Sequence, residues 1–295
     1  MKTIGFIGVG IMGKPMVRNL MEAGFSLHIY ARTKEKVADV IAEGAAFYAT
    51  IAECVQGCDA VITMVGFPPD VEEVYFKKGN ILDSAAPGTY LIDMTTTSPT
   101  LAERLYAKGT AAGFHVLDAP VTGGDTGAIQ GTLSILVGGD KADFTACLLL
   151  FQAMGTNINY QGKAGAGQHA KMANQIMIAG ALSGVCEAFA YAKAKGLDLE
   201  VLLQSVATGA AGSAQLNAFG EKIIQHNYAP GFYMKHFIKD MKIAKEEAEH
   251  AHLHLQILQQ VLKNYEDLAA KDAQNEELGT QALITHYTDD LYERV

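Results

Sequence analysis

The sequence predicts an α/β protein with an N-terminal doubly wound parallel sheet, followed by an all-α C-terminal domain that a long interdomain helix joins to it. Two observations carry this prediction. Up to about residue 162, short β-branched or apolar runs alternate with helical stretches, which is the pattern of consecutive βαβ units. Beyond Gly162 only helical patterns remain, and the first of them, from about Gly165 to Lys195, is rich in alanine. We therefore expect one domain at residues 1–162 and a second at 163–295.

Six runs are expected to form the strands of the sheet, and several are apolar on successive residues, as strands buried on both faces should be. They span residues 4–7, 26–30, 60–65, 89–94, 115–119 and 133–137, and helices are expected among them at 11–23 and 100–113. In the second half, Gly196 is typical of the residue after a helix, Asp198 of a helix cap, and Pro230-Gly231 of a turn. Helical segments there are expected to begin near residues 198, 213, 235, 255 and 276.

The composition narrows the class of partner. The chain has 295 residues and a formal charge of −9 without a basic tract, so no nucleic acid is expected, since that partner requires clustered Lys and Arg. No segment reaches the ~18 uninterrupted apolar residues of a membrane span. The nearest, residues 172–192, contains Asn174, Gln175 and Glu187, which predicts a buried helix and no membrane partner.

Two groups of residues invite a metal-binding interpretation that the sequence does not favour. Cys54 and Cys58 could share a helix face, but no companion pair has zinc spacing. The four cysteines are therefore expected to be buried thiols of a cytoplasmic protein. The histidines at 250, 252 and 254 follow a glutamate-rich stretch, which is typical of a solvated surface. We expect no metal cofactor.

A glycine-rich turn lies between an apolar strand and a helix at the start of the chain. Gly8 allows a tight turn, Gly10 lets the backbone approach a pyrophosphate, and Gly13 permits close helix–strand packing. The N–H groups at the start of the helix then face the phosphates. In this strand–turn–helix context the motif predicts a Rossmann domain, and the alternative is a glycine-rich turn without a ligand. The residues expected at the dinucleotide are Gly8, Val9, Gly10, Ile11, Met12 and Gly13.

The end of the second expected strand bears on which cofactor binds. A site that prefers NAD would carry an acidic residue there for the ribose 2′-OH, but Ala31-Arg32-Thr33 follows the strand and no acid occurs before Glu35. Because a cation at this point pairs with a 2′-phosphate, Ala31, Arg32 and Thr33 predict that NADP(H) is preferred over NAD(H). A single arginine leaves open the alternative that it covers a solvated loop and that either cofactor binds.

Three later segments combine residues that could carry chemistry. The turn from Asp118 to Gly124 presents the Thr122 hydroxyl and consecutive N–H groups, which suit a carboxylate, and a plain glycine turn is the equal alternative. Lys171 and Asn174 lie three residues apart on one face of the long helix. Lysine side chains usually lie exposed to solvent, but a partly buried lysine near a domain boundary can serve as an acid or base. The third segment, residues 236–242, predicts by itself only an amphipathic helix start.

Taken together, these segments resemble the ordered motifs of the β-hydroxyacid dehydrogenase family. The resemblance spans residues 4 to about 242, at family-like spacing and in the same order. It implies a Rossmann domain, a helical C-terminal domain, and catalysis in the cleft between them. The motifs are Gly8-x-Gly10-x2-Gly13, Asp118-Ala-Pro-Val-Thr-Gly-Gly124, Gly131-Thr-Leu133, Gly165-x-Gly-x3-Lys171-x2-Asn174 and Lys239-Asp240.

The resemblance also implies roles for individual residues. Lys171 matches the catalytic lysine, and Asn174 matches its helix neighbour at the substrate. Thr122, Gly123 and Gly124 match the loop that binds the substrate carboxylate. Met64 and Val65 match positions of the cofactor site. Thr96 matches a residue beside the nicotinamide, and Lys239 matches the lysine that closes over the cofactor.

Within the family, Ile11-Met-Gly-Lys-Pro15, Asn174-Gln175 and Ala211-Gly-Ser213 are most similar to tartronate semialdehyde reductases. We therefore expect reduction of a small semialdehyde that bears a carboxylate, and a homodimer or homotetramer formed through the C-terminal domain. Thr122 stands where the family usually has Ser, and Ala31 replaces the usual Asn. The alternatives are an NAD-dependent 3-hydroxyisobutyrate dehydrogenase, a glyoxylate/succinic semialdehyde reductase, an imine-reducing relative, which typically lacks the lysine, and a nucleotide sensor without catalytic activity.

Overall fold

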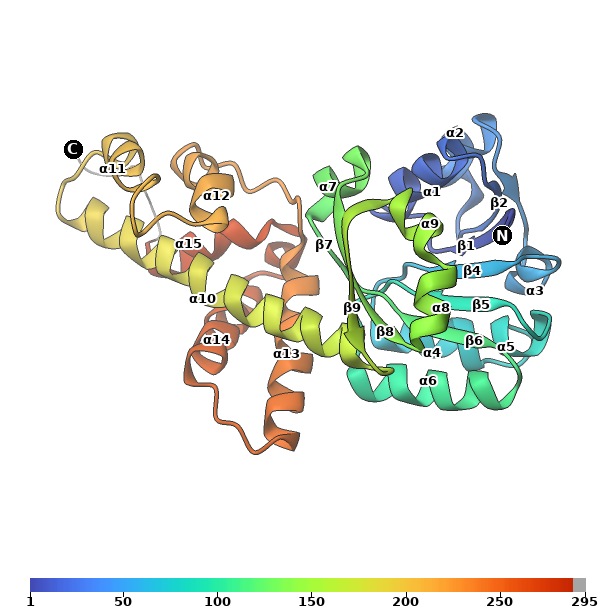
Figure 1. Ribbon diagram of the computed structural model, residues 1–295. Coiled ribbons are helices and arrows are strands. Elements are labelled where there is room, and N and C mark those ends of the chain that lie inside the picture. The colour runs from blue at the N-terminus through green and yellow to red at the C-terminus, as the bar shows by residue number, and fades with distance from the viewer. Residues whose placement is uncertain (289–295) are drawn as a thin grey trace. The chain divides into compact units, whose positions relative to one another are not determined.

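The computed structural model describes residues 1–288, so the last seven residues of the expected second domain lie outside the described part. The chain divides into two compact units, Met1–Lys171 and Met172–Val295 (Figure 1). The first unit is built around a sheet and the second around helices. The α/β fold class predicted from the sequence is confirmed.

The sheet of the first unit has the strand order β3-β2-β1-β4-β5-β6-β8-β7, with β9 pairing with β8 (Figure 1). Strands β1 to β6 pair in parallel, β6 and β7 pair antiparallel with β8, and β8 pairs in parallel with β9. The chain crosses over between β1 and β4, so the carboxyl ends of these two strands mark a topological switch point. The strands are β1 (Thr3–Ile7), β2 (Ser26–Tyr30), β3 (Ala46–Phe47), β4 (Ala60–Thr63), β5 (Tyr90–Asp93), β6 (His115–Asp118), β7 (Val121–Thr122), β8 (Leu133–Gly139) and β9 (Gly155–Gly162).

The six expected strands are present, and the structure adds β3, β7 and β9. Two of these have only two residues, too few to show a periodic pattern. The third, β9, reads GTNINYQG and is largely exposed, so it lacks the apolar run that identified the other strands. Apolar burial on both faces is confirmed for the central strands, because Val61 and Ile62, which are neighbours in β4, belong to different hydrophobic clusters.

Helices pack on the sheet of the first unit, and their positions follow from the apolar residues that they bury. Met16 and Leu20 of the first helix belong to one cluster, whereas Val71 and Tyr75 of the fourth belong to the other. The helices are α1 (Gly13–Glu22), α2 (Ala38–Ala42), α3 (Ile51–Val55), α4 (Pro68–Phe76), α5 (Ile81–Ser84), α6 (Pro99–Ala111), α7 (Gly124–Gln130), α8 (Lys141–Ala146) and α9 (Leu148–Gln152), with a 3₁₀ turn η1 (Lys34–Val37).

The long helix α10 (Ala166–Ala194) leads into the second unit. Gly196, with φ of 71°, follows it, and the Asp198 side chain caps the next helix through the N–H groups of Glu200 and Val201, as expected. The segment expected to be a helix from about Glu276 is instead two 3₁₀ turns and a short helix, because a bridge between Tyr233 and Gly279 interrupts it. The elements are α11 (Leu199–Val206), α12 (Ala214–Ile224), α13 (Met234–His250), α14 (Gln256–Lys271), η2 (Ala273–Glu277), η3 (Thr280–Leu283) and α15 (Ile284–Tyr287).

Helix α10 is buried on one face only, which corrects the expectation of a buried helix. By length and composition it is the one helix among the described residues that could span a membrane, and 44% of its most apolar window is buried. One face is packed in the core through residues such as Leu182, Cys186 and Phe189. Over residues 172–194 the exposed face is mainly apolar but includes one charged residue. Its exposed residues are Ala173, Met177, Gly184, Glu187, Ala188, Tyr191 and Ala194.

Candidate active site

The glycine-rich turn lies at the carboxyl end of β1, at the switch point of the sheet. Gly8 has φ of 98°, and a Cβ atom there would collide with the main-chain carbonyl of Met64; one at Gly13 would collide with the carbonyl of Gly8. At Gly10, by contrast, a Cβ atom would meet no described heavy atom within 4 Å. Two glycines therefore close the turn and the third leaves its outer side open, which fits a dinucleotide pyrophosphate.

The next two strands bring further predicted cofactor residues to the same edge of the sheet. Met64 and Val65 follow β4, and Thr96 follows β5. The main-chain N–H of Val65 donates to the Thr95 hydroxyl at 3.0 Å, and that of Met64 donates to the Ile7 carbonyl at 2.8 Å. The end of β1 and the segments after β4 and β5 are thus tied to one another beside the switch point.

Beneath these segments lies a buried polar group that sequence patterns do not reveal. The hydroxyl groups of Tyr75 and Thr63 are 2.9 Å apart, and Thr63 donates to Asp93 Oδ1 at 2.8 Å. Asp93 is 1% exposed, and burial raises the pKa of its carboxyl from 3.8 to about 6. The N–H of Thr95 also donates to Oδ1, at 3.1 Å. This group braces the loop that contains Thr96.

Arg32, with Ala31 and Thr33, follows the carboxyl end of β2, and its side chain is 82% exposed. Its Nη1 atom lies 3.6 Å from Asp70 Oδ1, near the start of α4. Asp70 also accepts a hydrogen bond from the Phe67 N–H at 3.0 Å, which fixes the carboxylate in place. The guanidinium is therefore a surface cation that is loosely paired with a fixed acid.

The loop predicted to bind a carboxylate turns between β7 and α7. Thr122 ends β7 and is half-buried. Gly123 and Gly124 have φ of 131° and 65°, values that side chains with a Cβ atom rarely adopt. Two consecutive glycines are therefore required by the path of the backbone, whichever ligand the loop binds.

Lys171 is 6% exposed and lies in the second turn of α10, whose start is held on the first unit. Asp118, at the end of β6, accepts hydrogen bonds from the N–H groups of Gly165 at 2.8 Å and Gln168 at 2.9 Å. Burial raises the pKa of the Asp118 carboxyl, and these N–H groups oppose that rise. A carboxylate at a helix N-terminus is also favoured by the helix dipole. Because Lys171 is buried, the alternative that it is an ordinary solvent-exposed lysine is excluded.

In the second unit, two predicted site residues belong to one buried chain of polar contacts. Asn174 Nδ2 donates to Gln175 Oε1 at 2.7 Å, and Gln175 Nε2 donates to Asp240 Oδ2 at 2.6 Å. Lys239 Nζ lies 2.9 Å from the other oxygen of Asp240, which is 1% exposed. Asn174 on α10 and Lys239 on α13 are therefore linked through Gln175 and Asp240. That they face the residues of the first unit across a cleft stays a prediction.

The direction of these hydrogen bonds follows from the charge at one end of the chain. A carboxylate paired with an ammonium group only accepts, so Gln175 must turn its NH2 group toward Asp240. Its Oε1 is then the atom next to Asn174, and it accepts from the Asn174 NH2 group. Asp240 thus sets the orientation of both amides.

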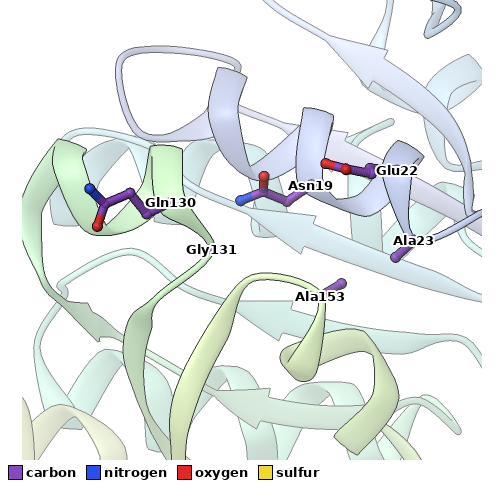
Figure 2. Close-up of a pocket in the computed structure, with 6 residues that line it drawn as sticks. All are labelled: Asn19, Glu22, Ala23, Gln130, Gly131 and Ala153. Carbon is purple, nitrogen blue, oxygen red and sulfur yellow. The ribbon is translucent and has the colours of Figure 1, made fainter.

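Other features of the molecule lie apart from these residues. The four cysteines are buried and unpaired, and burial raises the pKa of the Cys54 thiol to about 12. Among residues 1–288, no three His, Cys, Asp or Glu side chains gather as a metal site. A surface hollow of about 300 Å³ between α1, α7 and α9 contains none of the predicted site residues (Figure 2); its lining residues are Asn19, Glu22, Ala23, Gln130, Gly131 and Ala153.

The fold and the glycine-rich turn define the class of the protein as a dinucleotide-binding protein with a Rossmann domain. Residues 3–162 match the model of the NAD-binding domain of 6-phosphogluconate dehydrogenase. Residues 165–287 match the model described as the NAD-binding domain of NADP-dependent 3-hydroxyisobutyrate dehydrogenase. The chain belongs to the β-hydroxyacid dehydrogenase family, and it is an NAD(P)-dependent dehydrogenase of that family.

Relatives over nearly the whole chain support this assignment. An uncharacterized oxidoreductase of Bacillus subtilis is 49% identical over 96% of this chain and 97% of its own length. The 2-hydroxy-3-oxopropionate reductase of Escherichia coli is 38% identical over 85% of this chain and 86% of its own length. A solved structure of Mycobacterium tuberculosis 3-hydroxyisobutyrate dehydrogenase with L-serine has a TM-score of 0.87 and 30% identity, covering 98% of this chain and 99% of that one.

Proposed function

We propose that the protein reduces a small semialdehyde bearing a carboxylate, similar to tartronate semialdehyde, to the hydroxy acid, with NADPH as the preferred reductant. The observation that carries this proposal is the buried Lys171, on one helix face with Asn174, in a chain with the family's loop at Thr122–Gly124. The similarity to the E. coli 2-hydroxy-3-oxopropionate reductase supports the substrate class.

In the proposed reaction each group of residues has one task. Residues 8–13 and Met64, Val65, Thr96 and Lys239 hold the dinucleotide, which supplies a hydride when bound. Thr122 and the N–H groups of Gly123 and Gly124 bind the substrate carboxylate. Lys171 donates a proton to the oxygen as negative charge develops on it, and charge stabilisation at that oxygen contributes several kcal/mol. Asn174, whose NH2 group is engaged by Gln175, presents its Oδ1 as an acceptor for the product hydroxyl or the lysine ammonium.

The preference for NADPH rests on Arg32, which we propose pairs with the 2′-phosphate. Its exposure and the absence of an acid in residues 31–34 support this proposal. The contact with Asp70, at 3.6 Å, must open or rearrange on binding, so we expect a preference and no strict selection. The Pseudomonas aeruginosa relative described as NAD-dependent L-serine dehydrogenase, 36% identical over 84% of this chain, supports the alternative that NAD serves.

We further propose a homodimer or homotetramer formed through the C-terminal unit, in the cytoplasm. The mainly apolar exposed face of α10 supports a subunit contact, because exposed apolar surface rimmed by polar residues often marks an interaction site. The four unpaired thiols agree with a reducing compartment.

The deciding experiment is a turnover assay with small semialdehydes, glyoxylate, 3-hydroxyisobutyrate and L-serine, each with both cofactors. We expect the highest kcat/KM for a carboxylate-bearing semialdehyde with NADPH. Lys171→Ala should lower kcat by about 10² to 10⁴-fold without changing the Kd for NADPH, since a general acid acts in the transition state. Lys195→Ala, at an exposed lysine just beyond α10, is the matched control. Equal loss of turnover and NADPH affinity in Lys171→Ala would contradict the role of this lysine.

A further inference from the structure

One buried side chain in the first turn of α10 contacts the loop expected beside the nicotinamide. Gln168 is 0% exposed, and its Nε2 donates to the Thr95 carbonyl at 2.8 Å. Its Oε1 accepts from the Thr97 N–H at 3.0 Å. Because Thr95 and Thr97 flank Thr96, a single amide holds the main chain on both sides of that residue.

The helix turn that carries Gln168 has little freedom to move on the sheet. Its own N–H donates to Asp118, as does that of Gly165. A Cβ atom on Gly167 would lie 2.7 Å from the Asp118 carbonyl oxygen and would collide with that of Leu136. The turn is therefore seated on the backbone of β6 and β8 at the closest approach that glycine allows.

Lys171 follows Gln168 by three residues on the same continuous helix, so the two lie on one face. The amide that holds the Thr96 loop is thus one helical turn from the proposed proton donor. We propose that Gln168 is a positioning residue, which sets the separation between the Thr96 loop and Lys171 for coordinated hydride and proton transfer. This inference rests on the proposed function, and it assigns Gln168, which is 0% exposed, no contact with the substrate or the reacting atoms.

The test compares Gln168→Met, which keeps the length of the side chain and removes both hydrogen bonds, with His169→Gln on the exposed side of the same turn. We expect Gln168→Met to lower kcat by up to about 10²-fold, because a small displacement of reacting groups has an effect of that size. The KM for NADPH should change by less than about twofold, a range that leaves binding energy nearly intact. The primary kinetic isotope effect with 4-deuterated NADPH should rise, a change that a general loss of folded protein would not produce.

A second readout does not depend on turnover. In the protein without cofactor, amide hydrogen exchange of a peptide containing residues 95–97 should accelerate in Gln168→Met, since the Thr97 N–H loses its acceptor. Gln168→Glu keeps that acceptor and loses the donor to Thr95, so it should show slower exchange there than Gln168→Met. It also provides a variant to measure if Gln168→Met fails to fold.

The outcomes separate the two proposals. Wild-type values of kcat, isotope effect and exchange in the Gln168 variants would overturn the positioning role alone. The same would follow if His169→Gln slowed turnover as much as Gln168→Met. A wild-type protein that turns over no semialdehyde with either cofactor would overturn both this inference and the proposed function.

Discussion

Two glutamines on α10, seven residues apart, hold the regions on either side of Lys171 in different ways. Gln168 bonds to main-chain atoms of Thr95 and Thr97. Gln175, on the same helix face, bonds instead to the Asp240 carboxylate and the Asn174 amide. A main-chain partner is present whatever the sequence, so the first anchor depends only on the path of the loop. The second depends on one charged side chain, and the region around Asn174 should therefore be more sensitive to substitution of its partner.

The largest expected effect tests that sensitivity at Asp240. Asp240→Asn removes the charge that fixes both amides and leaves Lys239 without its 2.9 Å partner. Removing one partner of a buried pair costs about 3–5 kcal/mol of folding stability. We also expect kcat per folded molecule to fall, because the amides of Gln175 and Asn174 can then reverse. Urea unfolding together with steady-state kinetics measures both quantities.

Glu246→Gln, an exposed acid on the same helix, is the control for Asp240→Asn and should leave both quantities unchanged. If Asp240→Asn retained wild-type kcat once corrected for folded protein, the carboxylate would not set the amide orientation. The two glutamines would then differ in their effect on folding stability and not in their effect on turnover.

The contrast also shows which parts of the site sequence patterns can reveal. The strands, the glycine-rich turn and Lys171 have local signals: apolar runs, φ requirements and motif spacing. Gln168 and Asp93 have no such local signal. The sequence around an isolated polar residue does not show whether a distant group in the fold forms a hydrogen bond with its side chain. Their partners, at Thr95 and Thr63, become visible only when β4, β5 and α10 are placed in three dimensions. The sequence does not predict strand β9 for a similar reason, since this strand is defined by its pairing with β8 and its own residues are largely polar.

In the buried carboxylate of Asp93, one oxygen has neither a main-chain nor a side-chain partner in the described part of the chain. Oδ1 accepts from Thr63 and Thr95, whereas Oδ2 has no hydrogen-bond partner among residues 1–288. Burial raises the pKa of the Asp93 carboxyl from 3.8 to about 6. Between these two pH values, the folded protein therefore still carries a proton that the unfolded chain has already released. The free energy of unfolding should therefore fall by about 3 kcal/mol from this group as pH rises from about 3 to about 7, most steeply between about 4 and 6.

Asp93→Asn removes that dependence, because an amide does not titrate in this range. Relative to the wild type, the variant should gain about 2.5 kcal/mol in free energy of unfolding between pH 4 and pH 7, measured by urea unfolding at intervals of one pH unit. If the free energies of unfolding of the two proteins changed in parallel with pH, the pKa of Asp93 would not be raised. The buried carboxylate would then have more hydrogen-bond partners than its neighbours indicate.

The smallest effects compare two glycines on α10 that differ only in what surrounds them. Gly167→Ala should destabilise by about 1–3 kcal/mol and reduce turnover, because the added methyl group has no room beside Asp118 and Leu136. Gly184→Ala should stabilise by up to about 1 kcal/mol, since no described heavy atom lies within 4 Å and alanine is the better helix former. Thermal unfolding of both variants measures the difference. A loss of stability at Gly184 would mean that this face of α10 is covered in solution, and would favour the proposed subunit contact over an exposed surface.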